Sequence, residues 1–307
     1  MKILNEGDNR RGNLLLSFAS LLALMLTVPV SVEAMGLSGR LDNTFGDRGV
    51  VLFQAGGAAN DSTLQTDGKI VSSVSSPERL VRHNIDGNLD TVFGNGSGYV
   101  AAADKAVAIQ PDGMLIATDE VSVGYPRFAF RVQRFYPDGS IDVTFGNNGT
   151  AIAEFESTLE PINIHGYDVT ASDVVVQDNG KILIAGTYNY YHYDGFSYSR
   201  RPIAQALARF NSDGMLDSGF GDLGTLVNDT ITAAEPGENP RESVSAAVLQ
   251  SDGRLLVGGY LENNDLDIMV TRYNIDGTPD PGFGVNGVAT VDLGSVEIGR
   301  DISIQSN

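Results

Sequence analysis

The sequence predicts an all-β protein, a β-propeller built from four-stranded antiparallel blades. The chain aligns with itself, and each repeat contains short apolar runs separated by Asp-Gly or Asn-Gly pairs. Such pairs between apolar runs are the strongest short signals for β-hairpins. No stretch after Pro29 has a helical period with caps. Four-stranded units that recur every ~40–50 residues are typical of propeller blades.

The first motif, D-G-x-x-D-x-x-F-G, marks the corner between the third and fourth strands of a repeat. It lies in "NIDGNLDTVFGNGSG" at residues 84–98, and a decayed copy begins at Leu37. Further copies are "YPDGSIDVTFGNNG" from Tyr136, "NSDGMLDSGFGDLG" from Asn211 and "NIDGTPDPGFGVNG" from Asn274. The phenylalanines of the five copies are Phe45, Phe93, Phe145, Phe220 and Phe283.

Two further motifs complete the repeat. One carries a glutamine just before a turn and an apolar run after it, as in "VQDNGKILIAG" from Val176. The other places an arginine before each full corner, namely Arg82, Arg134, Arg209 and Arg272. The first strand of a blade therefore ends at the glutamine, and the second is the apolar run. The third ends at the arginine–aromatic pair, and the fourth follows F-G-x-x-G.

Together, "LARFNSDGMLDSGFGDLG" and "VQDNGKILIAG" resemble the delta-60 repeat of bacterial secreted and surface proteins. The resemblance covers roughly residues 37–307. That family is understood as a β-propeller, so the resemblance implies a scaffold and a location outside the cytoplasm. It implies no particular activity.

The repeats define four full blades plus an incomplete fifth. A fourth-strand sequence begins near Gly49, and the chain ends in "RDISIQSN", which matches a first strand. We expect a truncated product, or a fifth blade that stays incomplete. The propeller domain is predicted to span residues 35–307.

Residues 1–34 have the order of a secretory signal peptide. Lys2, Arg10 and Arg11 precede the apolar run "LLLSFASLLALMLTV", and Val32 and Ala34 occupy cleavage-type positions. The run is shorter than the ~20 residues of a membrane helix. We expect a secreted, periplasmic or cell-surface protein with no membrane span after signal cleavage.

Charge and cysteine content limit the possible partners and chemistry. The formal net charge is -19, a field that repels phosphate backbones and disfavours nucleic acid as a partner. The chain has no cysteine, which excludes disulfides, thiolate nucleophiles and Cys-ligated metals.

Binding is expected on the face where the copies differ. The a–b and c–d turns keep their length, whereas the long d–a and b–c loops share the opposite face, and loops on a rigid scaffold often bind ligands. "TYNYYHYDGFSYSRR", residues 187–201, is the richest in aromatic side chains, which suit a glycan or a protein surface. The alternative is a hairpin whose tyrosines pack on one another. The candidate ligand-binding residues are Tyr188, Tyr190, Tyr191, His192, Tyr193, Phe196 and Tyr198.

The recurring D-G-x-x-D permits a calcium interpretation, with Asp86, Asp90, Asp138 and Asp142 as candidates. The calcium-loop spacing D-x-[DN]-x-[DN]-G is missing, however. The simpler interpretation pairs each upstream arginine with the second aspartate of the corner, namely Asp90, Asp142, Asp217 and Asp280. Apart from such calcium we expect no cofactor, and no helix follows "GNGSG" to make a phosphate cradle.

No catalytic motif is present: the sequence contains neither H-E-x-x-H nor G-x-S-x-G. Acids before the first strands are expected near the channel mouth, where they either catalyse or bind loop amides: Asp61, Asp104, Asp173 and Asp301. The sequence therefore favours a secreted, non-enzymatic binding or surface scaffold. The alternative is an extracellular polysaccharide hydrolase or lyase that uses these carboxylates.

Overall fold

The computed structural model describes residues 41–52, 57–124, 127–155, 164–193, 196, 198–228, 241–263 and 265–305. Contacts divide the chain into Met1–Gly39 and Arg40–Asn307, and the strands of the described residues, β1 to β16, lie in the second unit. The expected signal peptide lies outside the described residues. Within them, no helix has the length and apolar character that crossing a bilayer requires.

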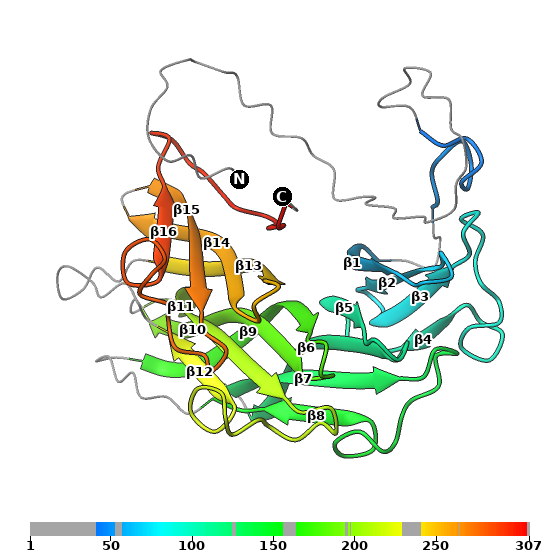
Figure 1. Ribbon diagram of the computed structural model, residues 1–307, viewed down its shortest axis with the longest axis horizontal. Coiled ribbons are helices and arrows are strands. Elements are labelled where there is room, and N and C mark those ends of the chain that lie inside the picture. Colours follow the sequence, from blue (N-terminus) through cyan, green and yellow to red (C-terminus); the bar gives the residue numbers. More distant parts are fainter. Residues whose placement is uncertain are drawn as a thin grey trace. The chain divides into compact units, whose positions relative to one another are not determined.

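The strands form four antiparallel sheets of four, and each sheet uses consecutive strands (Figure 1). The first sheet contains β1 (Ala59–Leu64), β2 (Ile70–Val74), β3 (Arg79–His83) and β4 (Tyr99–Ala101). The second contains β5 (Ala106–Ile109), β6 (Leu115–Gly124), β7 (Arg127–Phe135) and β8 (Thr150–Ala153). The third contains β9 (Ile164–Val176), β10 (Ile182–Tyr193), β11 (Tyr198–Phe210) and β12 (Thr225–Asn228). The fourth contains β13 (Arg241–Leu249), β14 (Leu255–Asn263), β15 (Asp265–Tyr273) and β16 (Val288–Val291). The predicted all-β propeller with four full blades is confirmed.

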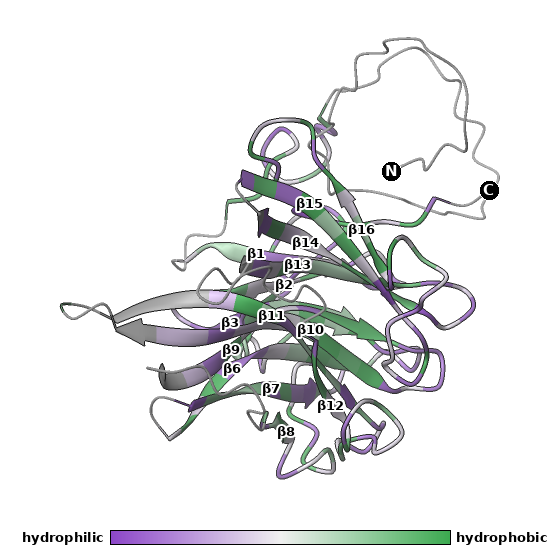
Figure 2. Cartoon of the chain, turned by 90° about the vertical axis from the view of Figure 1, so that its left-hand side faces the viewer, coloured by the Kyte–Doolittle hydropathy of each residue, from purple (hydrophilic) through white to green (hydrophobic). Residues whose placement is uncertain are grey.

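The first strands of successive sheets contact one another, in the order β1, β5, β9 and β13. They are the inner strands of the blades, as expected for sheets arranged around a central channel. The apolar core lies between neighbouring sheets, in three clusters that join the first to the second, the second to the third and the third to the fourth. Figure 2 shows the hydrophobic residues concentrated in the strands of these sheets. Each blade therefore depends on its neighbours for burial of its faces.

The D-G-x-x-D-x-x-F-G corners connect one blade to the next. In the second blade the Nε of Arg134 donates to Asp142 Oδ2 at 2.7 Å, and its guanidinium lies 4.6 Å from the ring centre of Phe145. Its Nη1 donates to the carbonyl of Ser212 in the third blade. The equivalent pairs are Arg82–Asp90, Arg209–Asp217 and Arg272–Asp280. The predicted pairing of each arginine with the second aspartate is confirmed.

The glycine of F-G also has a defined role in this connection. Gly146 has a φ of 53° and donates its N–H to the carbonyl of Asp213 in the next blade at 2.8 Å. A Cβ at this position would lie 2.3 Å from the carbonyl oxygen of Thr150. Positive φ and close backbone approach together require glycine here. The motif that resembles a metal or phosphate loop is thus a joint between blades.

Two segments carry the sequence of the incomplete fifth blade. In residues 41–52, the N–H of Gly46 donates to the carbonyl of Asp86 at 2.8 Å, which is the same joint onto the first blade. In residues 292–305 no strand is assigned. There the N–H of Ile302 donates to Asp301 Oδ1 at 2.8 Å, as Ser62 does to Asp61 in the first blade. Both segments thus repeat contacts that the full blades make.

Candidate functional site: a polar pocket at the inner strands

One repeat position brings five polar side chains to a common cavity. Each first-strand sequence ends at a glutamine, and the residue five positions earlier is Asn60, Lys105, Ser172, Ser245 or Arg300. All five line a single cavity of about 600 Å³. The rest of its lining is Ala59, Ala171, Ser243, Val244, Tyr260 and Ile298. Every blade, including the incomplete fifth, contributes to this axial pocket.

A β-bulge places this residue in three of the blades. The pairing of β1 with β2 shifts between Ala59 and Asp61, and that of β13 with β14 shifts between Val244 and Ala246. The pairing of β9 with β10 shifts in the same way between Ala171 and Asp173. A bulge inserts one unpaired residue and redirects its side chain. The inserted residues are Asn60, Ser245 and Ser172.

Three of the five side chains also connect neighbouring blades. Asn60 Nδ2 donates to the carbonyl of Asp104 at 2.7 Å, and Ser172 Oγ donates to the carbonyl of Val244 at 2.8 Å. Lys105 acts through a second residue: its Nζ lies 3.5 Å from Glu120 Oε1, and Glu120 Oε2 accepts from the Ala171 N–H at 3.3 Å. The wall of the axial pocket is therefore built by the contacts that hold the ring together.

The next position, four before the glutamine, alternates between aspartate and alanine: Asp61, Ala106, Asp173, Ala246 and Asp301. Asp61 Oδ2 accepts from the Val107 N–H at 2.9 Å, and Asp173 Oδ2 accepts from the Ala247 N–H at 2.8 Å. Asp61 and Asp173 thus bind backbone amides, but these belong to the inner strands β5 and β13 of the next blades and not to loops as expected. Asp104 lies six residues before its glutamine, so it is not their equivalent.

The electrostatics of this ring are unusual at Asp173. Burial raises its pKa to about 7. The N–H groups of Ala247 and Val174 favour the charged form, but the charges of Asp61 and Asp301 oppose it. Burial likewise raises the pKa of Asp61, and Asp301 adds to the shift. The charge of Asp301 thus disfavours ionisation of both Asp61 and Asp173.

The predicted aromatic site forms a long hairpin of β10 and β11, paired as far as Tyr193 and Tyr198. Tyr188 is only 2% exposed and packs in the core, 5.5 Å between ring centres from Tyr167. Tyr190 is partly buried against the same core. A ligand surface on this hairpin therefore has to be formed by its other aromatic residues.

The remaining candidates on this hairpin differ in their surroundings. Tyr191 donates its hydroxyl to Asp168 Oδ2 at 2.9 Å, which ties it to β9. Phe196 is 97% exposed at the hairpin turn. The side chains of His192, Tyr193 and Tyr198 lie outside the described part of the structure. Part of the set thus packs as the hairpin alternative predicts, and Phe196 provides an exposed aromatic surface.

The four calcium candidates have contacts of other kinds. Asp90 and Asp142 form the corner ion pairs. Asp86 Oδ1 accepts from the Asn88 N–H at 3.0 Å, and Asp138 Oδ1 accepts from the Ser140 N–H at 2.8 Å. These are turn contacts, and they favour a structural role for all four. A further cavity of about 420 Å³ is lined by turn residues including Asp252, Arg254 and Asp276, which belong to the turns common to all blades.

The fold and the site together define a β-propeller with a polar axial pocket on its variable-loop face. Residues 177–220 and 250–283 match a domain of unknown function, DUF5122, that is described as a beta-propeller. These are the turn-to-corner segments of the third and fourth blades. No curated protein matches the chain.

Two solved structures are similar to the chain at low identity. One is the periplasmic gluconolactonase PpgL of Pseudomonas aeruginosa: 15% identity, 78% of this chain and 72% of that chain, TM-score 0.37. The other is virginiamycin B lyase from Staphylococcus aureus: 11% identity, 74% of this chain and 87% of that chain, TM-score 0.25.

Proposed function

We propose that this protein is a secreted, non-enzymatic binding propeller that holds a hydroxyl-rich ligand, a glycan, in the axial pocket. The observation that carries the proposal is the convergence of Asn60, Lys105, Ser172, Ser245 and Arg300 on one cavity. Nothing in the repeat requires the same side chain at this position, and the five copies hold four different residue types. A position that stays polar while its chemistry varies is suited to contact a ligand of low symmetry.

The chemistry of the lining favours a sugar. Hydroxyls, an amide and two cations supply hydrogen-bond partners for ligand hydroxyls. Tyr260 adds an aromatic face with a polar end, which suits the apolar face of a sugar ring. The volume of about 600 Å³ lies within the ~300–1,000 Å³ of typical ligand sites.

The aromatic hairpin extends the same face. Phe196 lies at its turn, and the b–c loops lie on the side of the blades where the inner strands that line the pocket begin. A glycan chain held by one residue in the pocket would then meet exposed aromatic surface further along. Export rests on the signal-peptide pattern of residues 1–34.

A glycan array followed by calorimetry tests the proposal. Replacing Arg300 or Tyr260 with alanine is expected to weaken binding of the best glycan roughly tenfold or more, as expected for loss of one charge-assisted hydrogen bond or one stacking surface. Affinities would be measured at constant salt, because Arg300 is exposed and its contribution is screened.

Two control variants locate the site. Met215→Ala changes a residue that is 68% exposed in a c–d turn, away from the pocket, and should bind as the wild type does. Phe196→Ala probes the hairpin. If only Phe196→Ala weakens glycan binding, the binding site lies on the hairpin and not in the pocket. If no glycan on the array binds the protein, the proposal is rejected.

A second function is supported by one observation, the pKa of Asp173 at about 7. Glycoside hydrolysis uses a carboxylic acid with a raised pKa together with a second carboxylate, and Asp61 contributes to the raised pKa of Asp173. The protein would then be the polysaccharide hydrolase or lyase considered above. Turnover of a polysaccharide that is lost in Asp173→Ala and Asp61→Ala would establish the enzyme. Binding without turnover would favour the scaffold.

A further inference from the structure

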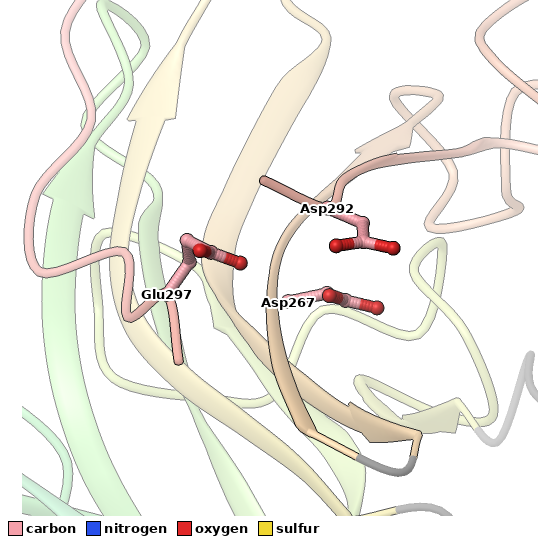
Figure 3. Close-up of side chains that lie close together, drawn as sticks. All are labelled: Asp267, Asp292 and Glu297. Carbon is pink, nitrogen blue, oxygen red and sulfur yellow. The ribbon is translucent and has the colours of Figure 1, made fainter. Parts of the chain in front are cut away.

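Three carboxylates meet between the third strand of the fourth blade and the segment that follows its fourth strand. Asp267 lies on β15, Asp292 directly follows β16, and Glu297 lies in the loop beyond. One oxygen of each lies within 4.8 Å of the other two. Figure 3 shows Asp292 and Glu297 turned toward Asp267.

Asp267 has a buried carboxylate oxygen without a hydrogen-bond partner in the described chain. Its side chain belongs to the buried set at 9% exposure, and its Oδ1 has no hydrogen-bond partner among the described residues. The pairing of Ile268 with Val291 places Asp267 beside Asp292, and like charges directly opposite on paired strands are destabilising. A buried oxygen without a partner is costly unless a cation occupies the space in front of it.

The loop after β16 holds the other two carboxylates in this position. The Glu297 N–H donates to the carbonyl of Leu266 at 2.6 Å, which fixes the loop against β15. Glu297 Oε1 accepts from Ser295 Oγ at 2.7 Å, and Asp292 Oδ1 accepts from the Gly294 N–H at 2.7 Å. None of the three carboxylates forms an ion pair with a lysine or arginine of the described chain. The loop therefore brings three negative charges together without a protein cation.

We propose that Asp267, Asp292 and Glu297 bind a calcium ion. Calcium takes oxygen ligands at ~2.3–2.6 Å, so two oxygens on one ion lie at most ~5 Å apart, which the three carboxylates satisfy. An all-carboxylate set is the preference of hard cations and not of zinc or copper. Asp292 is exposed, which leaves room for water ligands to complete the coordination. Magnesium requires near-ideal octahedral geometry at ~2.0–2.1 Å, so oxygens as much as 4.8 Å apart suit it less well.

The ion would fix the segment that leads to the axial pocket. Residues 292–297 precede Ile298 and Arg300, which line the cavity. The calcium proposal does not depend on the proposed glycan function, because its contacts lie on β15 and in this loop.

Titration calorimetry of the full chain tests the calcium proposal. Bound metal is first removed with a chelator, and the protein is then titrated with calcium chloride and, in parallel, with magnesium chloride. We expect one calcium ion per chain and weaker magnesium binding. The midpoint temperature of thermal unfolding should rise by roughly 5 °C when the calcium concentration is ~100-fold above the Kd. Asp267→Asn should lower the calcium affinity roughly tenfold or more, because calcium binds more weakly to a site with fewer charged ligands. The increase in unfolding temperature with calcium should then disappear. Asp222→Asn, an exposed aspartate in another corner, should leave both unchanged.

The chelated proteins provide a second measurement. Asp267→Asn removes a like charge from the cluster, so without calcium it should unfold at the wild-type temperature or above. If this variant does not fold, Glu297→Gln replaces it with the same expected loss of affinity. The absence of calcium binding, equal binding of magnesium, or unchanged binding in the variants that fold would overturn the proposal.

Discussion

Replacing Arg134 with methionine is expected to lower the free energy of unfolding by about 3–5 kcal/mol, the usual cost of removing one partner of a buried ion pair. Asp142 is 1% exposed and would lose its cation. The substitution keeps apolar contact with Phe145 but also removes the hydrogen bond to the Ser212 carbonyl, which joins the second blade to the third. Urea unfolding followed by circular dichroism measures the loss.

The third blade supplies a matched control. Asp217 is paired with Arg209, but Lys181 Nζ also lies 2.7 Å from its Oδ2. Arg209→Met is therefore expected to cost only about 2 kcal/mol, because a cation remains beside the carboxylate. The second blade has Met114 at the position of Lys181. Adding Met114→Lys to Arg134→Met should recover part of the loss. Equal costs in the two blades, or no recovery, would contradict this account of the corners.

The blade fold could be predicted from the sequence because its signals are local and repeated. Asp-Gly pairs fix hairpins, and the arginine and aspartate of one corner are only eight residues apart, as in the bond from Arg134 to Asp142. The joints between blades were not predicted. The contact of Arg134 with Ser212 spans 78 residues and depends on how successive sheets stack. Local patterns do not contain that information.

The pocket could have been found from the sequence by counting back from each glutamine. That count aligns Asn60, Lys105, Ser172, Ser245 and Arg300, but it requires knowledge that a bulge interrupts the first strand in three of the blades. The aromatic content of residues 187–201 predicted a ligand site on the hairpin instead. Tyr188 illustrates the reason: alternating tyrosines in a paired strand place some rings in the core, and composition does not distinguish the two faces. The acids of Asp267, Asp292 and Glu297 come from a strand and a later loop, so no spacing rule joins them.

Asp173 is expected to make the protein less stable as the pH rises from about 4 to about 7. Its folded pKa is about 7, against about 3.9 in an unfolded chain. Between these values the folded protein binds more protons than the unfolded chain, so the free energy of unfolding falls with rising pH. One group with this shift changes that free energy by at most about 4 kcal/mol.

The corner aspartates act in the opposite sense and in a lower pH window. Burial alone would raise the pKa of Asp142, but hydrogen bonds from Thr144 and Arg134 outweigh it and hold the pKa below its ordinary value. The pKa values of Asp90 and Asp217 are lowered as well. Their stabilisation is present above about pH 4 and is lost as the pH falls through their folded pKa values. The two windows meet near pH 4–5, so the combined stabilisation from Asp173 and the corner aspartates is expected to be largest there.

Unfolding in urea from pH 4 to 8 measures this dependence, and Asp173→Ala isolates the contribution of one group. Alanine is the residue that the second and fourth blades hold at this position, as Ala106 and Ala246. The variant loses two backbone hydrogen bonds at every pH, but its stability should fall less steeply between pH 4 and 7 than that of the wild type. Met215→Ala should keep the wild-type slope, since it changes no titratable group. The chemical shift of the Asp173 carboxyl carbon, followed by NMR as the pH is changed, measures the same pKa directly. A midpoint near pH 4 would show that Asp173 ionises normally in the folded protein and would contradict the prediction.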